Sequence, residues 1–160
     1  LTEHALNIDI RHSLKSGIMF YVPTTVKPRL FGLPIPNGWS LAVESIIETG
    51  SPFTPSKEYP DIDQTSSEDI EINSLRLPMT AVFDVRFQKE FKLAGIDWNG
   101  VIWVENLFNN RNVVHVYSST GRPDTENNQS NIVYGGSEYQ NNPGNYDYGR
   151  QIRVGLEMNL

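Results

Sequence analysis

Cysteine is absent from the 160 residues, so neither a disulfide framework nor a thiolate metal site can be proposed. Long apolar runs are absent as well, because no stretch approaches the roughly 18 apolar residues that a membrane-spanning helix needs. The N-terminus has no basic stretch followed by an apolar one, so no secretion signal is visible. These absences do not exclude a membrane β-barrel, whose strands need only about 9–11 alternating residues.

Positive charge is also scarce relative to negative charge. The net charge is −6, and many of the acids fall in one stretch: Glu58, Asp61, Asp63, Glu68, Asp69 and Glu71. A chain with this balance and no basic face is a poor candidate for binding nucleic acid. The sequence also has no Gly-rich phosphate loop and no nucleophile-elbow pattern. We therefore predict no catalytic residues, no enzyme activity and no cofactor.

The acidic stretch does not predict a calcium site. Asp61 and Asp63 have the spacing of the first two ligands of an EF-hand loop. However, Ser66 stands where the sharp turn needs Gly, and Ile72 stands where a bidentate Glu is required. The histidines are far apart and have no neighbouring ligands at metal spacing; they are His4, His12 and His115. We expect a solvated loop here and no metal site.

What the sequence does contain is a series of segments in which apolar and polar residues alternate, as in half-buried strands. About five long strands are expected, within residues 1–22, 39–47, 81–91, 100–123 and 150–160. The fourth is expected to continue, with a kink or bulge, past the polar residues 109–112. Short or medium turns at 23–38 and 95–100 alternate with long loops at 51–80 and 121–149. This order predicts an all-β fold, an antiparallel up-and-down meander.

Short motifs follow one another along almost the whole chain: Asp9-Ile10-Arg11-His12; Trp39-Ser40-Leu41 with Thr49-Gly50-Ser51-Pro52-Phe53-Thr54-Pro55; Arg76-Leu77-Pro78 ahead of Phe83-Asp84-Val85-Arg86 and Lys89; Glu105-Asn106-Leu107-Phe108-Asn109 with Asn112-Val113, Tyr117 and Thr120-Gly121-Arg122-Pro123; and Tyr148-Gly149-Arg150. Their joint order resembles the C-terminal end of TonB-dependent outer-membrane receptors, particularly the SusC-like type of Bacteroidota-like bacteria. No single motif is specific; the order of the motifs carries the resemblance.

The resemblance implies that residues 1–160 are the C-terminal portion of a transmembrane β-barrel of about 22 strands with an N-terminal plug. Five strands cannot close a membrane barrel on their own, because the smallest have about eight. The implied partners are the remaining barrel strands, the plug, outer-membrane lipid and a surface lipoprotein. The implied function is uptake of a siderophore, cobalamin or glycan, energised through the plug by the TonB complex. The implied location is the bacterial outer membrane, with the C-terminus on the periplasmic side.

The polar faces of the expected strands carry charged side chains that would line the lumen of such a barrel. They are Lys15, Glu44, Asp84, Arg86, Glu90, Arg153 and Glu157. One hypothesis is that they pair with one another and with the hydrated surface of the plug; each such ion pair on a wet wall would contribute little to stability. The sharper reading is that a few of them contact passing substrate. The sequence does not choose between these readings.

The loop at 121–149 interleaves tyrosines with asparagines. Tyr134, Tyr139 and Tyr146, with Tyr148 beside them, could stack on a sugar or a flat siderophore. The alternative is that these rings anchor the tip of their own loop.

A different class of protein also fits the alternation. A soluble β-sandwich, complete at 160 residues, could bind carbohydrate through the same Tyr/Asn loop. In a sandwich the apolar strand faces point into a shared core, whereas in a barrel they face lipid, and alternation alone cannot separate the two. Trp39, Trp98 and Trp103 near expected strand ends favour the membrane.

Overall fold

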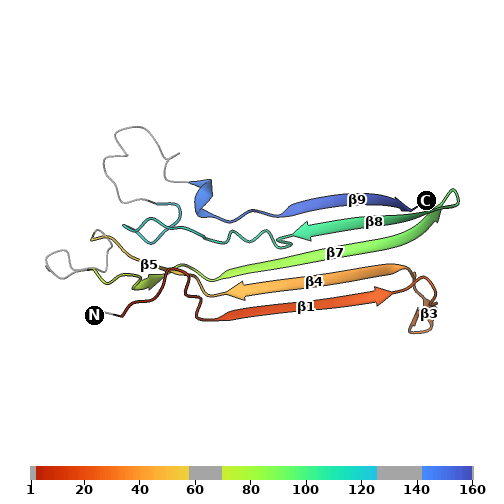
Figure 1. Ribbon diagram of the computed structural model, residues 1–160, viewed down its shortest axis with the longest axis horizontal. Coiled ribbons are helices and arrows are strands. Elements are labelled where there is room, and N and C mark those ends of the chain that lie inside the picture. Colours follow the sequence, from red (N-terminus) through yellow and green to blue (C-terminus); the bar gives the residue numbers. More distant parts are fainter. Residues whose placement is uncertain (1–2, 58–69, 126–141, 160) are drawn as a thin grey trace. The chain divides into compact units, whose positions relative to one another are not determined.

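The structure, a computed structural model, describes residues 3–57, 70–125 and 142–159. Its main element is a five-stranded sheet whose neighbouring strands run antiparallel and follow chain order (Figure 1). The strands are β1 (Ser13–Val22), β4 (Trp39–Glu48), β7 (Thr80–Leu93), β8 (Ile96–Glu105) and β9 (Gln151–Asn159). The predicted all-β meander is therefore confirmed. The sheet is open, with β1 and β9 at its edges, and the described residues do not close a barrel.

Shorter elements lie within the connections. The connection between β1 and β4 contains a small hairpin, β2 (Arg29–Leu30) and β3 (Leu33–Pro34). The connection between β4 and β7 is closed at its base by β5 (Pro52–Phe53) and β6 (Leu75–Arg76). A 3₁₀ turn, η1 (Pro143–Asn145), precedes β9. The first connection thus contributes only short pieces of strand, as the four prolines between 23 and 36 predict.

Three predicted strand boundaries are wrong. The first strand begins at Ser13, and residues 3–12 are not strand. The expected turn at 95–100 is instead the two-residue turn Ala94–Gly95, and its flanking residues Leu93 and Ile96 are paired. Both turn residues have positive φ, 53° and 81°, which is the requirement of a type I′ hairpin turn. A two-residue turn lets the strand begin earlier than the polar residues between 97 and 100 indicated.

The predicted continuation of the fourth strand to residue 117 is also wrong. β8 ends at Glu105 because Asn106 takes a positive φ of 52°, a conformation that Asn tolerates better than most residues. The Asn106 side chain then accepts from the N–H of Asn110 at 2.9 Å and donates to its carbonyl at 2.9 Å. Beyond this turn, Val113 keeps only an isolated bridge to Tyr146. The asparagines end the strand rather than kink it.

The chain divides into two compact units. Unit 1 comprises Leu1–Ser13, Ile47–Ala81 and Arg111–Tyr148, and unit 2 comprises Leu14–Ile46, Val82–Asn110 and Gly149–Leu160. Unit 2 contains most of the five-stranded sheet and the short connections. Unit 1 contains most of the long connections.

The register of the strands in unit 2 sorts side chains by polarity. Phe87, Ile102 and Val154 are paired across β7, β8 and β9. One residue further along, Arg86, Trp103 and Arg153 are paired in the same way. Because successive side chains of a strand point to opposite faces, unit 2 has an apolar face with Phe87 and a polar face with Arg86.

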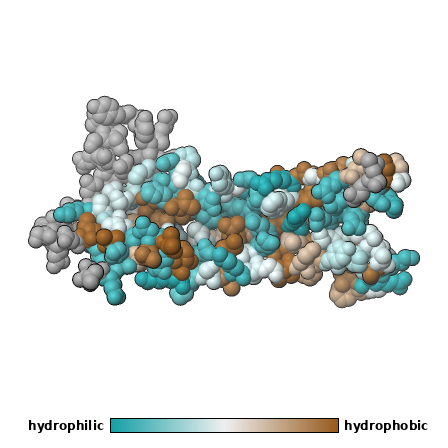
Figure 2. Space-filling model, viewed as in Figure 1, coloured by the Kyte–Doolittle hydropathy of each residue, from teal (hydrophilic) through white to brown (hydrophobic). Residues whose placement is uncertain are grey.

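Little of this apolar surface is buried. Among the described residues, the buried apolar side chains are Val116, at 4% exposure, and two prolines, Pro52 and Pro55, and all three belong to unit 1. On the apolar face of unit 2, Ile18, Val154 and Leu156 are exposed by 58%, 78% and 62%. Figure 2 shows apolar residues at the surface of the molecule among polar ones. A soluble domain of this length normally buries about two thirds of the surface of its unfolded chain, so the apolar face of unit 2 lacks a cover among the described residues.

Unit 1 is held largely by polar contacts to main-chain atoms. The Arg76 guanidinium donates to the carbonyls of Asp9 at 2.9 Å and Gly50 at 3.1 Å, and it pairs with the Asp9 carboxylate. The Asn73 amide donates to the carbonyl of Ala5 at 2.7 Å and to Asn7 Oδ1 at 2.6 Å. The side chains of Arg76 and Asn73 thus attach the segment before β1 to the base of the connection between β4 and β7.

Gly50 allows the closest approach of main chains in unit 1. A Cβ atom at this position would lie 2.0 Å from the carbonyl oxygen of Leu77 and 2.7 Å from that of Pro78. Both neighbours are backbone atoms, so neither can rotate away. The Leu77 N–H donates to Ser51 O at 2.9 Å, and this bond forms only if the two segments come this close.

We expect Gly50→Ala to lower the free energy of unfolding of unit 1 by about 3 kcal/mol, the upper range for forcing extra atoms into a packed site. The measurement is chemical denaturation, with limited proteolysis at 3–13 and 70–78 as a local readout. Gly17→Ala is the matched control. A Cβ at Gly17 would meet only Glu44 Cγ, at 4.0 Å, and Ala is favoured over Gly inside a strand. Equal midpoints for the two variants would contradict the close approach.

Candidate functional site

The charged residues predicted to line a lumen lie together on the polar face of unit 2. Arg86 and Arg153 are both paired with Trp103. Glu90 and Glu157 are both paired with Asn99. Since paired residues share a face and alternate residues of a strand return to it, these four side chains and Asp84 lie on one face.

The two remaining predicted residues reach the same face from β1 and β4. Ser40 Oγ donates to Gln88 Oε1 at 3.2 Å, which places Ser40, and by alternation Glu44, on the face of Arg86. A Cβ at Gly17 would lie 4.0 Å from Glu44 Cγ, so Gly17, and by alternation Lys15, share that face. The predicted set is Lys15, Glu44, Asp84, Arg86, Glu90, Arg153 and Glu157.

Several of these groups already have partners. Arg153 forms an ion pair with Glu105 at 2.9 Å, and its guanidinium lies 4.9 Å from the centre of the Trp103 ring. Asp84 Oδ1 accepts from the N–H of Asn106 at 2.8 Å, which helps to fix the turn after β8. Because Arg153 is about half exposed, its ion pair contributes at most about 1 kcal/mol. These contacts fix Arg153 and Asp84 on the polar face but leave other charged side chains of the face outside these pairs.

A shallow concavity of about 260 Å³ lies between β1, β4, β7 and β8 on this face. Met19, Glu44, Arg86 and Trp103 are among the residues that line it. Neither Glu44 nor Arg86 has a hydrogen-bond or ion-pair partner in the part of the chain that the structure describes. Asp84 also lines the concavity, but it is already bonded to the N–H of Asn106. The concavity therefore offers Glu44 and Arg86, with Trp103 paired beside Arg86, for an outside group to contact.

The apolar face carries aromatic rings near the end of unit 2 where the short connections lie. Trp39 stacks on Phe87 with 6.4 Å between ring centres, and Phe91 is paired with Trp98. The indole N–H groups donate to backbone carbonyls, Trp39 to Pro36 at 2.9 Å and Trp98 to Leu93 at 3.3 Å. Each of the two tryptophans thus lies on the apolar face and has its indole N–H bonded to a carbonyl near the strand end.

Lys89 is the charged residue that interrupts this apolar face in β7. Its ammonium group turns toward the strand end and donates to the carbonyls of Asn37 at 2.5 Å and Glu90 at 2.8 Å. A long side chain can in this way leave its stem on an apolar surface and place its charge among polar atoms. The face therefore stays apolar in spite of the lysine.

The tyrosines of the last long loop are only partly described. Tyr134 and Tyr139 lie outside the described residues, as do Asp61, Asp63 and Ser66 of the acidic loop. Tyr146 lies in unit 1, where the Arg111 guanidinium sits 4.4 Å from the centre of its ring. This contact gives Tyr146 a partner within the same connection between β8 and β9, although Arg111 lies before the loop at 121–149. Tyr148 is 80% exposed.

The scaffold around Tyr146 depends on buried asparagines whose structural role the sequence does not reveal. Asn112, 6% exposed, accepts from the Ala81 N–H and donates to the Ala81 carbonyl, both at 3.0 Å. Asn145, 2% exposed, donates to the carbonyl of Pro123 at 2.7 Å, and its own carbonyl accepts from Val114 at 2.9 Å. The sequence predicts a kinked strand at Asn112 and a loop at Asn145, because composition does not reveal which side-chain amides will bond to a distant main chain.

Among the carboxylates of unit 1 that the structure describes, Asp124 has a displaced pKa. The Arg122 guanidinium donates to both oxygens of Asp124, at 3.1 and 3.4 Å. These bonds, with a further one from the Thr125 hydroxyl, lower the pKa of Asp124 from its usual value. Asp124 therefore stays ionised to a lower pH than an unpaired aspartate does.

The described residues contain no group of three or more His, Asp or Glu side chains that could hold a metal ion. Nor do they include a helix with the length and apolar character needed to cross a membrane. Comparison with known proteins found no matching family model, no matching curated protein and no matching solved structure.

We expect Asn112→Ala to lower the stability of unit 1 by about 2 kcal/mol, because it leaves main-chain groups of Ala81 without their side-chain partner in a buried site. Asn112→Asp is the informative companion. It keeps the acceptor for the Ala81 N–H but sets a carboxylate oxygen against the Ala81 carbonyl, so the loss should be at least as large at neutral pH and smaller in acid, where a protonated carboxyl can donate. Hydrogen exchange around residue 81 measures both. Unchanged exchange in both variants would contradict this role.

Proposed function

We propose that this chain is a wall segment of an outer-membrane β-barrel, the C-terminal portion of a TonB-dependent receptor that takes up a scarce nutrient. The observation that carries the proposal is the open antiparallel sheet of unit 2, with one uncovered apolar face and one charged face. Water is a poor solvent for the first face, and lipid is a poor solvent for the second. A barrel wall between lipid and an aqueous lumen suits both.

The edges of the sheet support a segment of a larger barrel. β1 and β9 are both edge strands, and the outer side of each presents main-chain groups that need partners. Unpaired edges in lipid cost several kcal/mol for each unsatisfied group. Neighbouring strands on both sides, from the rest of the same receptor, would satisfy them.

The aromatic rings support a particular orientation. Outer-membrane barrels place aromatic girdles at the membrane boundaries and short turns on the periplasmic side. Trp39, Phe91 and Trp98 lie on the apolar face near the end of unit 2 that carries the turn Ala94–Gly95. The end of β9 lies at the same end, because Asn159 is paired with Asp97. In the proposed orientation this end is periplasmic, and the connections between β4 and β7 and between β8 and β9 are external.

The polar face would supply part of the lumen. Glu44 and Arg86, which open onto the shared concavity, are the predicted lumen residues best placed to contact a plug or a passing substrate. Siderophores, cobalamin and glycans all remain compatible with this pair of charges. The segment itself would carry no catalysis, and the TonB complex would act on it through the plug.

The soluble β-sandwich is the second candidate. It needs a second sheet packed over the apolar face, and within residues 3–57, 70–125 and 142–159 the other ladders are the two-residue pairs β2–β3 and β5–β6. No specific observation favours it over the barrel wall. Lipid contact of the apolar face separates the two candidates.

The first test places a fluorophore on adjacent residues of β9. The chain has no cysteine, so Val154→Cys and Arg153→Cys each provide a unique attachment site, one on each face. In vesicles that contain nitroxide-labelled lipid, we expect strong quenching at position 154 and little at 153, because lipid contacts one face only. A sandwich would protect position 154 from water without quenching. Equal quenching at both positions would also count against a barrel wall.

The second test is electrophoresis of the native polypeptide from an envelope fraction, with and without boiling. We expect a band well above the 18.1 kDa of this chain, with a mobility that changes on boiling as closed barrels unfold. A soluble species near the chain mass, with no change on boiling, would refute the receptor hypothesis and favour the soluble carbohydrate-binding sandwich.

A further inference from the structure

The β2–β3 hairpin of unit 2 exposes a large aromatic side chain at its tip. Leu30 and Leu33 are paired, so the turn consists of Phe31 and Gly32 alone. Both have positive φ, 50° and 82°, as a type I′ turn requires. Asn or Asp is the usual first residue of such a turn, and a bulky residue there is an outlier that the local backbone disfavours.

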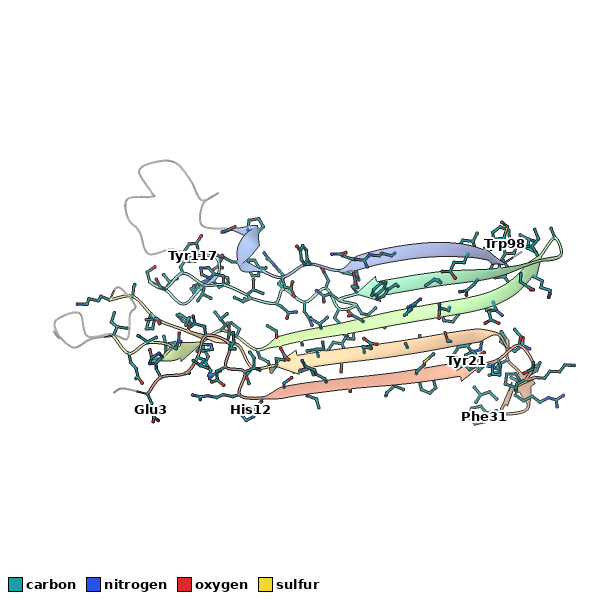
Figure 3. The ribbon with its side chains drawn as sticks, in the orientation of Figure 1. Glu3, His12, Tyr21, Phe31, Trp98 and Tyr117 are labelled. Carbon is teal, nitrogen blue, oxygen red and sulfur yellow. The ribbon has the colours of Figure 1, made fainter. Side chains whose placement is uncertain are left out.

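Nothing in the fold of the hairpin explains this aromatic. Phe31 is 97% exposed, and its neighbours Leu30 and Leu33 are exposed by 56% and 70%. Figure 3 shows Phe31 at the same end of unit 2 as Tyr21 and Trp98. The equivalent turn between β7 and β8 uses Ala94, a small residue, at the same position. The backbone conformation of Phe31 is unfavourable for a bulky residue, and within the hairpin it only exposes an apolar ring to solvent. We take this combination to mark a surface that contacts another molecule or a membrane.

The charges of the hairpin identify the kind of surface. The whole chain has a net charge of −6, yet residues 23–38 contain Lys27 and Arg29 and no acidic residue. Both cations are exposed. An apolar tip flanked by cations is complementary to a phospholipid surface that carries anionic headgroups, since the ring enters the boundary of the acyl chains while the cations stay among the phosphates.

We propose that the Leu30–Leu33 tip is a membrane-inserting finger that holds this end of unit 2 in the interface of an anionic phospholipid leaflet. Phe31 is the inserted residue, and Lys27 and Arg29 contact the headgroups. The finger adds a specific anchor that the wall function does not require. The finger proposal rests on the proposed function in one respect: a barrel wall would place this end of the sheet at a membrane boundary.

The test uses single cysteines labelled with an environment-sensitive fluorophore, in vesicles of phosphatidylcholine with phosphatidylglycerol as the minor component. With nitroxide-labelled lipid present, we expect a blue shift and quenching for Phe31→Cys. Replacing Lys27 and Arg29 by Gln should lower the ratio of inserted to free tip about 25-fold at low salt, from about fivefold for each cation near an anionic surface. Met79→Cys, equally apolar and 67% exposed but in unit 1, is the control and should stay in water.

A second variant separates membrane contact from hairpin structure. Phe31→Asn suits the positive φ and keeps the turn, but it removes the ring. A label at Leu33→Cys should then lose its blue shift, with the inserted fraction reduced roughly tenfold, the scale of burying one large apolar side chain. An unchanged spectrum at position 33 would overturn the role of Phe31.

The outcomes at positions 31 and 154 are independent. Quenching at 154 with a label at 31 in water leaves the wall in place and refutes the finger. Quenching at 31 but not at 154 supports the finger and refutes the wall. A label at 31 that is shielded from water yet unquenched by lipid means that a protein covers the tip, and it refutes the finger as well.

Discussion

Main-chain hydrogen bonding between antiparallel strands is the constraint on which the other features of unit 2 depend. Pairing fixes the register, and the register places Phe87, Ile102 and Val154 in one row and Arg86, Trp103 and Arg153 in the next. Once strands are paired in this way, two faces of opposite polarity follow without further packing. This explains how unit 2 can have a defined sheet although the buried apolar side chains among the described residues all lie in unit 1.

Much of the sheet could be predicted from the sequence, because a period of two is visible wherever one face is apolar. The alternation predicts β4, β7 and β9 to within two residues at each end and predicts which charged residues share the polar face. It places the start of the first strand too early, because residues 3–12 are not strand. The fourth strand was misplaced at both ends for local reasons. Ala94–Gly95 forms a turn that composition does not signal, and Asn106 ends the strand through its backbone conformation and its bonds to Asn110.

The organisation of unit 1 could not be predicted, because its stability comes from side chains that bond to distant main-chain atoms. Arg76 reaches Asp9 and Gly50, and Asn112 reaches Ala81. Such pairs have no period and no fixed spacing, so a single sequence contains no signal for them. The same holds for Gly50. A side chain is excluded at this position because the Leu77 backbone passes close to it, and the sequence does not reveal that approach.

The long connections are fastened at their bases. Pro52 and Phe53 pair with Arg76 and Leu75, and Glu105 pairs with Gln151 while the side chain of Asn109 accepts from the N–H of Arg150. A change of length or sequence in a connection beyond these closing pairs can therefore leave the register of the strands unchanged. The sheet and its connections can therefore diverge at different rates, and one sheet can carry many different loops.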